Sequence, residues 1–445
     1  MKHHSTASHG NPSRRRSDFA LESFDGPCMT SFGGAGLWRR FLDKLNIGRQ
    51  LAELCVPGTG RRFTTGQYLL AIVCGLLLGL QRQVDVAGLR QDPAALKALG
   101  LQAVPSQPSL SRFLSACPRR LGRQILDISR GFTRQLRSNF GSATIDLDGQ
   151  VQVVRGDAQG ADFGYNPKRR GSKSYFVLLG VLAECRDILD AWILPGSRAT
   201  VSARVARLAY RRSRRGLHSR TKRVRLRADA AFYSHEFLSL LERDKVTYFI
   251  AACLQPKLKR LLPNLIYCEL GGRWAISQLA YEGHGWGRER RMVVIRERLE
   301  PEGNRDKQLQ LFKCDGYAYQ VIVTNADWKP EEVWHFYNHR ARIENVIKES
   351  ACDFGLDHIV SRKWSGNMTW LALVVLAYNI TNWFREKVLG QHAHRQTAQT
   401  LRRILVELPG RLLSQGRQWW LKLWRDHPSR QEYERALERL DAFAL

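Results

Sequence analysis

At 445 residues the chain is longer than a single hydrophobic core usually supports, so we expect two or three domains. Its 70 Lys and Arg exceed its 41 Asp and Glu, and the resulting formal charge of +29 favours a polyanionic partner, nucleic acid, over a merely soluble or ribosome-associated basic protein. The nine cysteines are scattered and never spaced as Cys-x-x-Cys, which argues against a disulfide framework and a zinc ribbon and fits a reducing compartment.

The N-terminal segment and the longest apolar run argue against export and a membrane span. The chain begins with His, Ser and Arg where a signal peptide has an apolar core. The apolar run at residues 68–80 has about thirteen residues, whereas a helix that crosses hydrocarbon needs about twenty. We therefore expect a buried helix there, a cytoplasmic location and no membrane partner.

The N-terminal third combines a basic tail with a helical region. Residues 1–35 are rich in Ser, Gly, His and Arg without periodic apolar positions, which predicts disorder. Apolar residues then recur at three- and four-residue steps over 36–140, which predicts an all-helical region. Within it, the Ser- and Pro-rich residues 105–113 predict a turn that begins a helix. A phosphate could bind at that N-terminus, near Arg112, although an ordinary capped helix explains the pattern equally well.

Residues 141–252 have the pattern of short strands. The segments 143–148 with 151–154, 174–180 and 188–194 predict an antiparallel meander, with a Gly-Gln turn at 149–150. An amphipathic helix at 201–212 and a strand at 224–229 follow. Together these elements predict the first part of an α+β core.

The remaining chain predicts an insertion, a second part of the core and a tail. Residues 253–325 alternate apolar and polar positions, which predicts a β-rich insertion that returns to the core through its last strand. Residues 326–389 contain a long helix at 330–350, opened by Pro-Glu-Glu. Residues 390–445 are predicted to be helical, with breaks at 409–410 and 427–428. His392 and His394 are expected on the surface.

The predicted helix at 330–350 places four polar residues on one face. At about 100° per residue, Tyr337, Arg340, Glu344 and Lys348 fall within a sector of roughly 60°. Taken alone, such a face is usually the solvated side of a helix, with Glu344 and Lys348 as an ordinary i,i+4 ion pair.

Two upstream carboxylates change this interpretation. Asp148 and Asp229 lie within or at the end of hydrophobic strands, where a lone carboxylate is costly to bury unless a cation coordinates it. Oxygen ligands suit Mg²⁺ or Mn²⁺, and two such ions held by Asp148, Asp229 and Glu344 would support an in-line phosphodiester displacement. We therefore predict a metal-dependent site that cuts and rejoins DNA strands with these three acids.

At these residues the chain resembles the DDE transposases of bacterial insertion sequences, in the group that carries a Tyr-x-x-Arg-x-x-x-Glu signature. The signature is here Tyr337-Asn-His-Arg340-Ala-Arg-Ile-Glu344. Upstream, Tyr165-Asn-Pro-Lys168 and Arg227-Ala-Asp229-Ala-Ala-Phe232-Tyr233 are similar to motifs of the thirteen-eighty insertion-sequence family of this group. The resemblance extends from about Leu37 to Leu389.

The resemblance implies a ribonuclease-H-like catalytic core with a β insertion between the second Asp and the Glu. It implies that Asp148, Asp229 and Glu344 bind the metal ions, while Tyr337 and Arg340 contact the phosphate backbone near the scissile bond. It further implies a bacterial, nucleoid-associated enzyme that acts as a homodimer in a synaptic complex with double-stranded DNA. Residues 36–140 would bind the terminal inverted repeats, and residues 390–445 would serve dimerisation or DNA contacts.

At two positions of the candidate site the sequence leaves alternatives open. The family signature continues to a Lys seven residues beyond the Glu, where this chain has Ala351, and Lys348 on the same helix face is the candidate substitute. Asp146 and Asp148 are two residues apart on a strand and point to the same side, so Asp146 is an alternative first carboxylate. Asp148 is preferred because it directly precedes the predicted Gly-Gln turn.

Further candidate DNA contacts come from basic and aromatic residues. The basic run at 211–227 either follows a DNA backbone or forms a solvated loop, and Arg342 is another candidate on the catalytic helix. Trp286, within Gly-His-Gly-Trp-Gly, either stacks on a flipped base or packs internally. The candidates in the basic run are Arg211, Arg212, Arg214 and Arg215.

Three functions are compatible with these patterns. The three acids favour an active cut-and-paste transposase that moves an insertion sequence. Ala351 keeps open a catalytically inactive or domesticated relative that only binds DNA. A structure-selective nuclease would share the metal site but lack end-specific binding.

Overall fold

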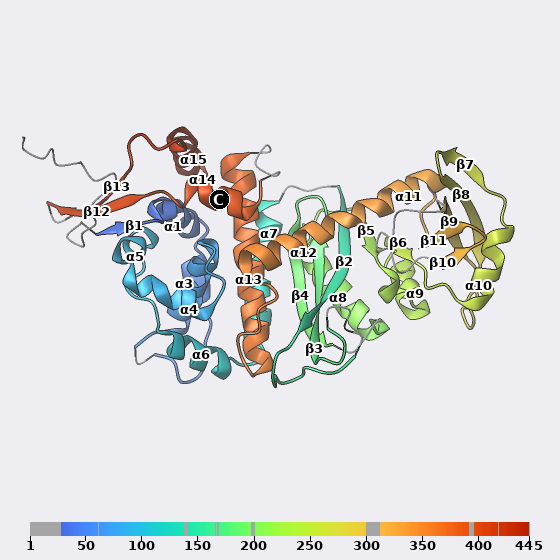
Figure 1. Ribbon diagram of the computed structural model, residues 1–445, viewed down its shortest axis with the longest axis horizontal. Helices are drawn as coiled ribbons and strands as arrows, with labels where there is room; N and C mark the ends of the chain where they lie inside the picture. The colour runs from blue at the N-terminus through green and yellow to red at the C-terminus, as the bar shows by residue number, and fades with distance from the viewer. Residues whose placement is uncertain are drawn as a thin grey trace, which may run out of the picture.

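The computed structural model describes residues 28–60, 62–137, 141–164, 166, 169–196, 201–299, 312–390, 396–416 and 418–444. The molecule is elongated: a helical body, a central sheet and a β-rich end follow one another, and one long helical run crosses the sheet (Figure 1). Within these ranges no helix is both long and apolar enough to cross a membrane. The predictions for residues 1–27, Tyr165, Lys168, His392 and His394 lie outside the described residues.

The prediction of helices between residues 36 and 140 is confirmed. The helix α3 covers the apolar run, begins with a capping box between Thr64 and Gln67, and is buried along most of its length, as expected. The helix α6 begins inside the Ser- and Pro-rich segment, with Pro108 in its first turn. The helices are α1 (Gly36–Lys44), α2 (Ile47–Ala52), α3 (Thr65–Leu77), α4 (Gln83–Gly88), α5 (Pro93–Leu99), α6 (Gln107–Ala116) and α7 (Leu121–Leu136).

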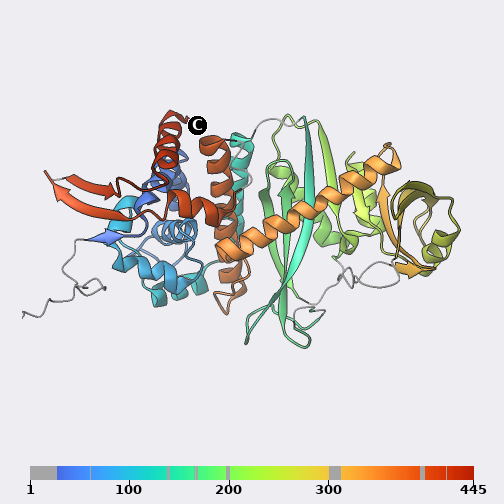
Figure 2. The same cartoon turned by 45° about the horizontal axis from the view of Figure 1, so that its top comes forward.

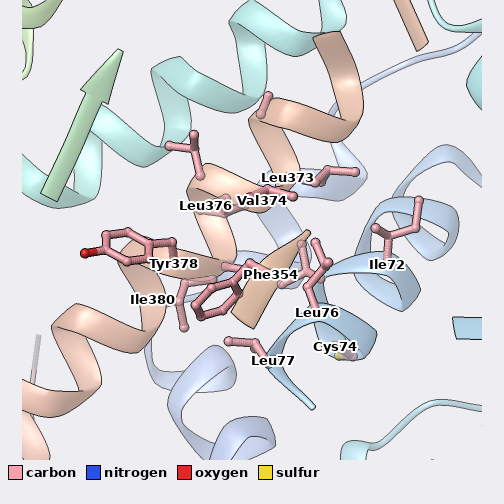
Figure 3. Close-up of a cluster of buried hydrophobic side chains, with 14 of the residues drawn as sticks. Ile72, Cys74, Leu76, Leu77, Phe354, Leu373, Val374, Leu376, Tyr378 and Ile380 are labelled. Carbon is pink, nitrogen blue, oxygen red and sulfur yellow. The ribbon is translucent and has the colours of Figure 1, made fainter. Parts of the chain in front are cut away.

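This helical region shares one hydrophobic core with the C-terminal part of the chain. The helix α13 (Trp364–Phe384) is buried from Gly366 to Phe384 and packs against α3, α6 and α7. Figure 3 shows Ile72 and Leu76 of α3, Leu373 and Leu376 of α13 and Phe354 of α12 in one hydrophobic cluster. A single core therefore joins segments that the sequence analysis assigned to separate regions.

The two ends of the described chain pair as strands, which corrects two predictions. The strand β1 (Met29–Thr30) pairs with β12 (Gly410–Gln415), and β12 pairs with β13 (Gln418–Leu423). Disorder is therefore wrong for residues 28–35, and a helix is wrong for 410–423. Gly416 takes a φ of +59°, which lets the hairpin turn, and a Cβ on Gly34 would collide with the carbonyl oxygen of Leu405. The predicted helices elsewhere in the tail are α14 (Ala398–Leu405) and α15 (Arg430–Ala442).

The central sheet confirms the predicted meander and α+β class. The strand β2 pairs antiparallel with β3 and parallel with β5, and β5 pairs parallel with β6, in the order β4-β3-β2-β5-β6. The predicted Gly-Gln turn is wrong, because β2 continues through it. A Cβ on Gly149 would collide with the ring of Phe176, so the glycine makes room for a neighbour. The strands are β2 (Ser142–Val153), β3 (Ser174–Leu182), β4 (Asp187–Pro195), β5 (Arg223–Ala228) and β6 (Thr247–Ala251).

Helices cover the two faces of this sheet differently. Ala143, Ile145 and Leu147 of β2 pack in one cluster with residues of α8 (Ala203–Arg215) and α9 (His235–Arg243). Since side chains alternate along a strand, Asp146 and Asp148 point to the opposite face. The long helical run crosses β2 on that opposite face (Figure 2).

The predicted insertion is confirmed as β-rich. Its last strand, β11, pairs with β6 of the core and with β9, so insertion and core form one continuous sheet. A short helix, α10 (Pro256–Leu261), opens the insertion. Its strands are β7 (Cys268–Gly271), β8 (Trp274–Tyr281), β9 (Arg290–Arg298), β10 (Phe312–Cys314) and β11 (Tyr317–Thr324).

The helix predicted at 330–350 consists of two parts, and the second part ends at Phe354 instead of near residue 350. The helix α11 (Pro330–Asn338) passes through a tight 3₁₀ turn (His339–Ala341) into α12 (Arg342–Phe354), and the two parts keep one direction (Figure 2). Gly355, with a φ of +68°, ends α12 in the left-handed conformation that favours glycine. The turn places Arg340 directly above the sheet.

Candidate functional site

Two parallel strands bring Asp148 and Asp229 together. Asp146 pairs in register with Arg227 and Leu147 with Ala228, so Asp148 and Asp229 are the next residues along β2 and β5. Neighbouring strands lie about 4.8 Å apart, which makes the two carboxylates close neighbours. Asp148 accepts a hydrogen bond from the Gly149 amide at 2.8 Å, and Asp229 accepts one from the Ala231 amide at 3.0 Å.

Arg340 reaches both carboxylates from the helical run above them. Its Nη2 lies 3.0 Å from Oδ1 of Asp148 and 3.8 Å from Oδ2 of Asp229. Its side chain is 14% exposed, so water screens these contacts only partly. One guanidinium thus faces two acids, and the predicted contact of Arg340 with a DNA phosphate stays a prediction.

Burial is the main influence on the ionisable groups of this site. The pKa of Asp148 is raised to about 6: burial is the largest cause, Asp229 and Glu344 add to it, and Arg340 opposes it. Burial also raises the pKa of Asp229, which Arg340 again opposes. The pKa of Tyr337 is raised to about 12, with burial again the largest cause. Two acids and one guanidinium therefore share a largely desolvated site.

Glu344 lies at the rim of this acid pair. It is exposed in the first turn of α12, one helical turn beyond Arg340, and its charge acts on Asp148. Within the described ranges, however, no three Asp, Glu, His or Cys side chains are gathered closely enough to hold a metal ion. Asp148 and Asp229 offer oxygen donors, which suit a hard divalent cation. The positive Arg340 guanidinium contacts both acids in this structure, and Glu344 is a further acid whose charge acts on Asp148.

The alternative carboxylate, Asp146, is engaged by another arginine. Arg227 donates from Nε and Nη2 to the two oxygens of Asp146 at 2.6 and 2.8 Å, and both side chains are almost fully buried. Its Nη1 donates to the carbonyl oxygen of Phe336 in α11 at 2.8 Å. Asp146 and Arg227 therefore tie the helical run to the sheet, whereas Asp148 faces Arg340 and Asp229.

Sequence reasoning missed this role of Arg227. The signal was a charged residue in the otherwise apolar end of β5, two positions before Asp229. A buried arginine requires an acid or a carbonyl partner, and such a position on a strand can be recognised before a structure exists.

The other predicted DNA contacts lie in three different places in the structure. Tyr337 is buried beside the acids, while Arg342 and Lys348 are exposed on α12. The arginines of α8 lie on the opposite face of the sheet, so the structure does not bring them to the acids. Arg112 is exposed on α6, away from the acids. The α8 residues are Arg211, Arg212, Arg214 and Arg215.

Two of the α8 arginines already have protein partners. The Arg212 guanidinium lies 4.3 Å from the centre of the Trp192 ring. Arg214 donates to the Tyr210 hydroxyl at 2.7 Å and lies 3.7 Å from Asp244. The predicted loop interpretation is also wrong for the start of the basic run, because residues 211–215 belong to the helix.

The structure favours internal packing for Trp286. This side chain is 9% exposed and contacts the rings of Tyr233, His235 and Tyr281. The Arg290 guanidinium lies over it, 4.7 Å from the ring centre. Stacking on a flipped base is therefore not supported in this conformation.

Comparisons with known proteins agree with this geometry. A family model described as Transposase DDE domain group 1 matches residues 16–445. Among solved structures, the chain is similar to a piggyBac transposase synaptic complex with hairpin DNA, with a TM-score of 0.50 and 12% identity over 84% of this chain and 79% of that chain. At this identity the likeness concerns the fold. No curated protein matches the chain.

Proposed function

Because the chain belongs to the transposase DDE domain group 1 family, we propose that it is an active, metal-dependent DNA transposase of the cut-and-paste type. One observation carries the proposal: Asp148 and Asp229 lie side by side on parallel strands, beneath the helical run that carries Arg340 and Glu344. The order β4-β3-β2-β5-β6, with three antiparallel strands followed by two parallel ones, supports a ribonuclease-H-like core.

In this proposal the chain's own residues prepare a phosphodiester for attack. Asp148, Asp229 and Glu344 hold one or two Mg²⁺ ions, which would activate a water or 3′-hydroxyl and stabilise the leaving oxygen. A guanidinium binds carboxylates and phosphates alike. Arg340 can therefore release a carboxylate oxygen and bind a phosphate oxygen of the DNA in its place. Tyr337, whose raised pKa keeps its hydroxyl protonated, can donate a hydrogen bond to the same phosphate.

The wider assembly follows from the same family assignment. We propose that residues 36–140 contribute to binding the terminal inverted repeats and that two copies act together in a synaptic complex. The net charge of +29 supports a double-stranded DNA partner. We also propose, from the motif resemblance alone, a narrower likeness to the thirteen-eighty family and a bacterial, nucleoid-associated setting.

A catalytically inactive DNA-binding relative is the second candidate. The observation that favours it is Arg340, which occupies the acid pair, together with the lack of a gathered three-acid site among the described residues. Cleavage assays with Mg²⁺ decide between the candidates, on a duplex from the ends of the genomic element and on a random duplex. Cuts confined to the element ends support a transposase, cuts in both duplexes indicate a nuclease, and binding without cuts indicates the inactive relative.

The variant Arg340→Ala should lower the single-turnover cleavage rate by on the order of 100-fold, because a phosphate loses a preorganised charged donor. The matched control is Arg435→Ala, at an exposed arginine on α15, which should keep most of the activity. A wild-type rate for Arg340→Ala would contradict its assignment to phosphate positioning.

Magnesium should stabilise the protein through Asp148. At about 100 times its dissociation constant, a bound ion contributes about 2.7 kcal/mol, which should raise the melting temperature by a few degrees. The variant Asp148→Asn should lose this shift, whereas Asp157→Asn, at an exposed acid, should keep it. Differential scanning calorimetry with and without Mg²⁺ measures both, and an unchanged shift in Asp148→Asn would remove Asp148 from the site.

A further inference from the structure

We propose that a groove between the helical body and the end of β2 binds the phosphate backbone of DNA a few nucleotides from the scissile bond. The groove has a volume of about 780 Å³ and lies between α4, the start of α6, the residues after β2 and the segment between α12 and α13. This inference rests on the proposed function, because it takes the scissile phosphate to lie at Asp148.

The strand β2 connects the groove with the acid pair. Asp148, Gln150 and Gln152 alternate onto the same face of β2, and Gln152 lines the groove. Four residues of a strand span about 13 Å, at about 3.3 Å per residue. The groove therefore lies within reach of phosphates only a few nucleotides from a scissile bond held at Asp148.

The charge of the groove suits phosphates. Arg82, Arg155 and Arg169 line it, all three are exposed, and none forms an ion pair with a described residue. Its one lining acid, Asp357, lies beside His358, with 3.9 Å between Oδ1 and Nε2. Three unpaired arginines around an open groove create a positive potential that attracts a polyanion.

The start of α6 adds hydrogen-bond donors to this groove. Gln107, the first residue of α6, lines the groove, and Ser106 before it caps no backbone N–H with its side chain. Pro108 has no N–H, so the Gln107 and Ser109 amides are the uncapped donors of this first turn, and the helix dipole favours an anion beside them. The sequence pattern at 105–113, which allowed a phosphate at this N-terminus, thus meets an independent cluster of arginines.

Charge reversal tests the groove. The probe is a fluorescein-labelled 30-base-pair duplex of fixed sequence, and its dissociation constant is measured by anisotropy from 50 to 200 mM salt. The variants Arg82→Glu and Arg155→Glu should each bind on the order of tenfold more weakly, and their salt dependence should flatten by about 0.9 in log K against log salt for each lost phosphate. The thermal unfolding midpoint of each variant checks folding.

The variant Arg435→Glu is the matched control. This exposed arginine lies on α15, which packs against α1 and α14 at the opposite end of the helical body from α6 (Figure 1), and its reversal changes the net charge equally. It should bind within twofold of the wild type. If the groove variants bind DNA as tightly as this control, the proposal that the groove binds DNA is wrong, whether or not the protein cleaves DNA.

A second measurement locates the contact. Single methylphosphonates, which remove one phosphate charge, are placed at successive positions from the mapped cleavage site. The wild type should lose affinity at positions a few nucleotides from the cut, and Arg155→Glu should lose no more there. Loss of binding in the groove variants without any cleavage by the wild type would retain the groove and reject the transposase. An equal loss at every position would overturn the proposed placement.

Discussion

Replacing Glu344 with Gln should abolish strand cleavage while leaving DNA affinity nearly unchanged. The substitution keeps the size of the side chain and removes its negative charge, which the proposed metal site needs. Loss of several kcal/mol of transition-state stabilisation corresponds to a rate decrease on the order of 1000-fold. Single-turnover cleavage of an element-end duplex measures the rate, and fluorescence anisotropy on the same duplex measures the affinity.

A glutamate elsewhere on the same helical run provides the control for Glu344. The variant Glu331→Gln removes one acid from the first turn of α11, where it only complements the helix dipole. It should cleave at close to the wild-type rate. If Glu344→Gln also cleaves at the wild-type rate, Glu344 does not belong to the catalytic site, and its exposed position is that of an ordinary surface acid.

Replacing Arg227 with Met should destabilise the protein by about 3–5 kcal/mol, because Asp146 would remain buried without its partner. Burial keeps water from replacing the two lost hydrogen bonds, and the carbonyl oxygen of Phe336 also loses its donor. Urea unfolding followed by tryptophan fluorescence measures the loss of free energy of unfolding.

Removing both partners separates the ion pair from simple packing. The double variant Arg227→Met with Asp146→Leu leaves no buried charge, so it should recover most of the lost stability. A single variant that loses less than about 1 kcal/mol, or a double variant without recovery, would contradict the assigned pairing. The cleavage rate of the refolded double variant would then show how much the hydrogen bond from Arg227 to Phe336 of α11 helps to position Arg340.

The register of β2 and β5 keeps two carboxylates close together. Leu147 pairs with Ala228, so Asp148 and Asp229 follow as neighbours at the ends of these pairs. Arg340 contacts both acids, and burial is the largest cause of the raised pKa of Asp148. A desolvated pair of acids that shares one guanidinium is the physical basis for expecting divalent ions here.

Elements whose pattern depends on near neighbours could be predicted from the sequence. The buried helix over 68–80, the helix start near residue 107 and the meander with the strand before Asp229 all follow from periodicity and capping residues within a short window. The candidate acids followed from their position on hydrophobic strands and from the signature around Glu344. These features depend on residues close along the chain, so local rules describe them.

Features that depend on distant residues needed the tertiary structure. Asp146 and Asp148 are equivalent in the strand pattern, and only Arg227 from the neighbouring strand distinguishes them. Gly149 looks like a turn residue until Phe176 is placed against it. Trp286 could stack on a base or pack inside until three rings and Arg290 surround it. Burial and charge pairing are properties of the space around a side chain, and folding fills that space with residues that a sequence window does not contain.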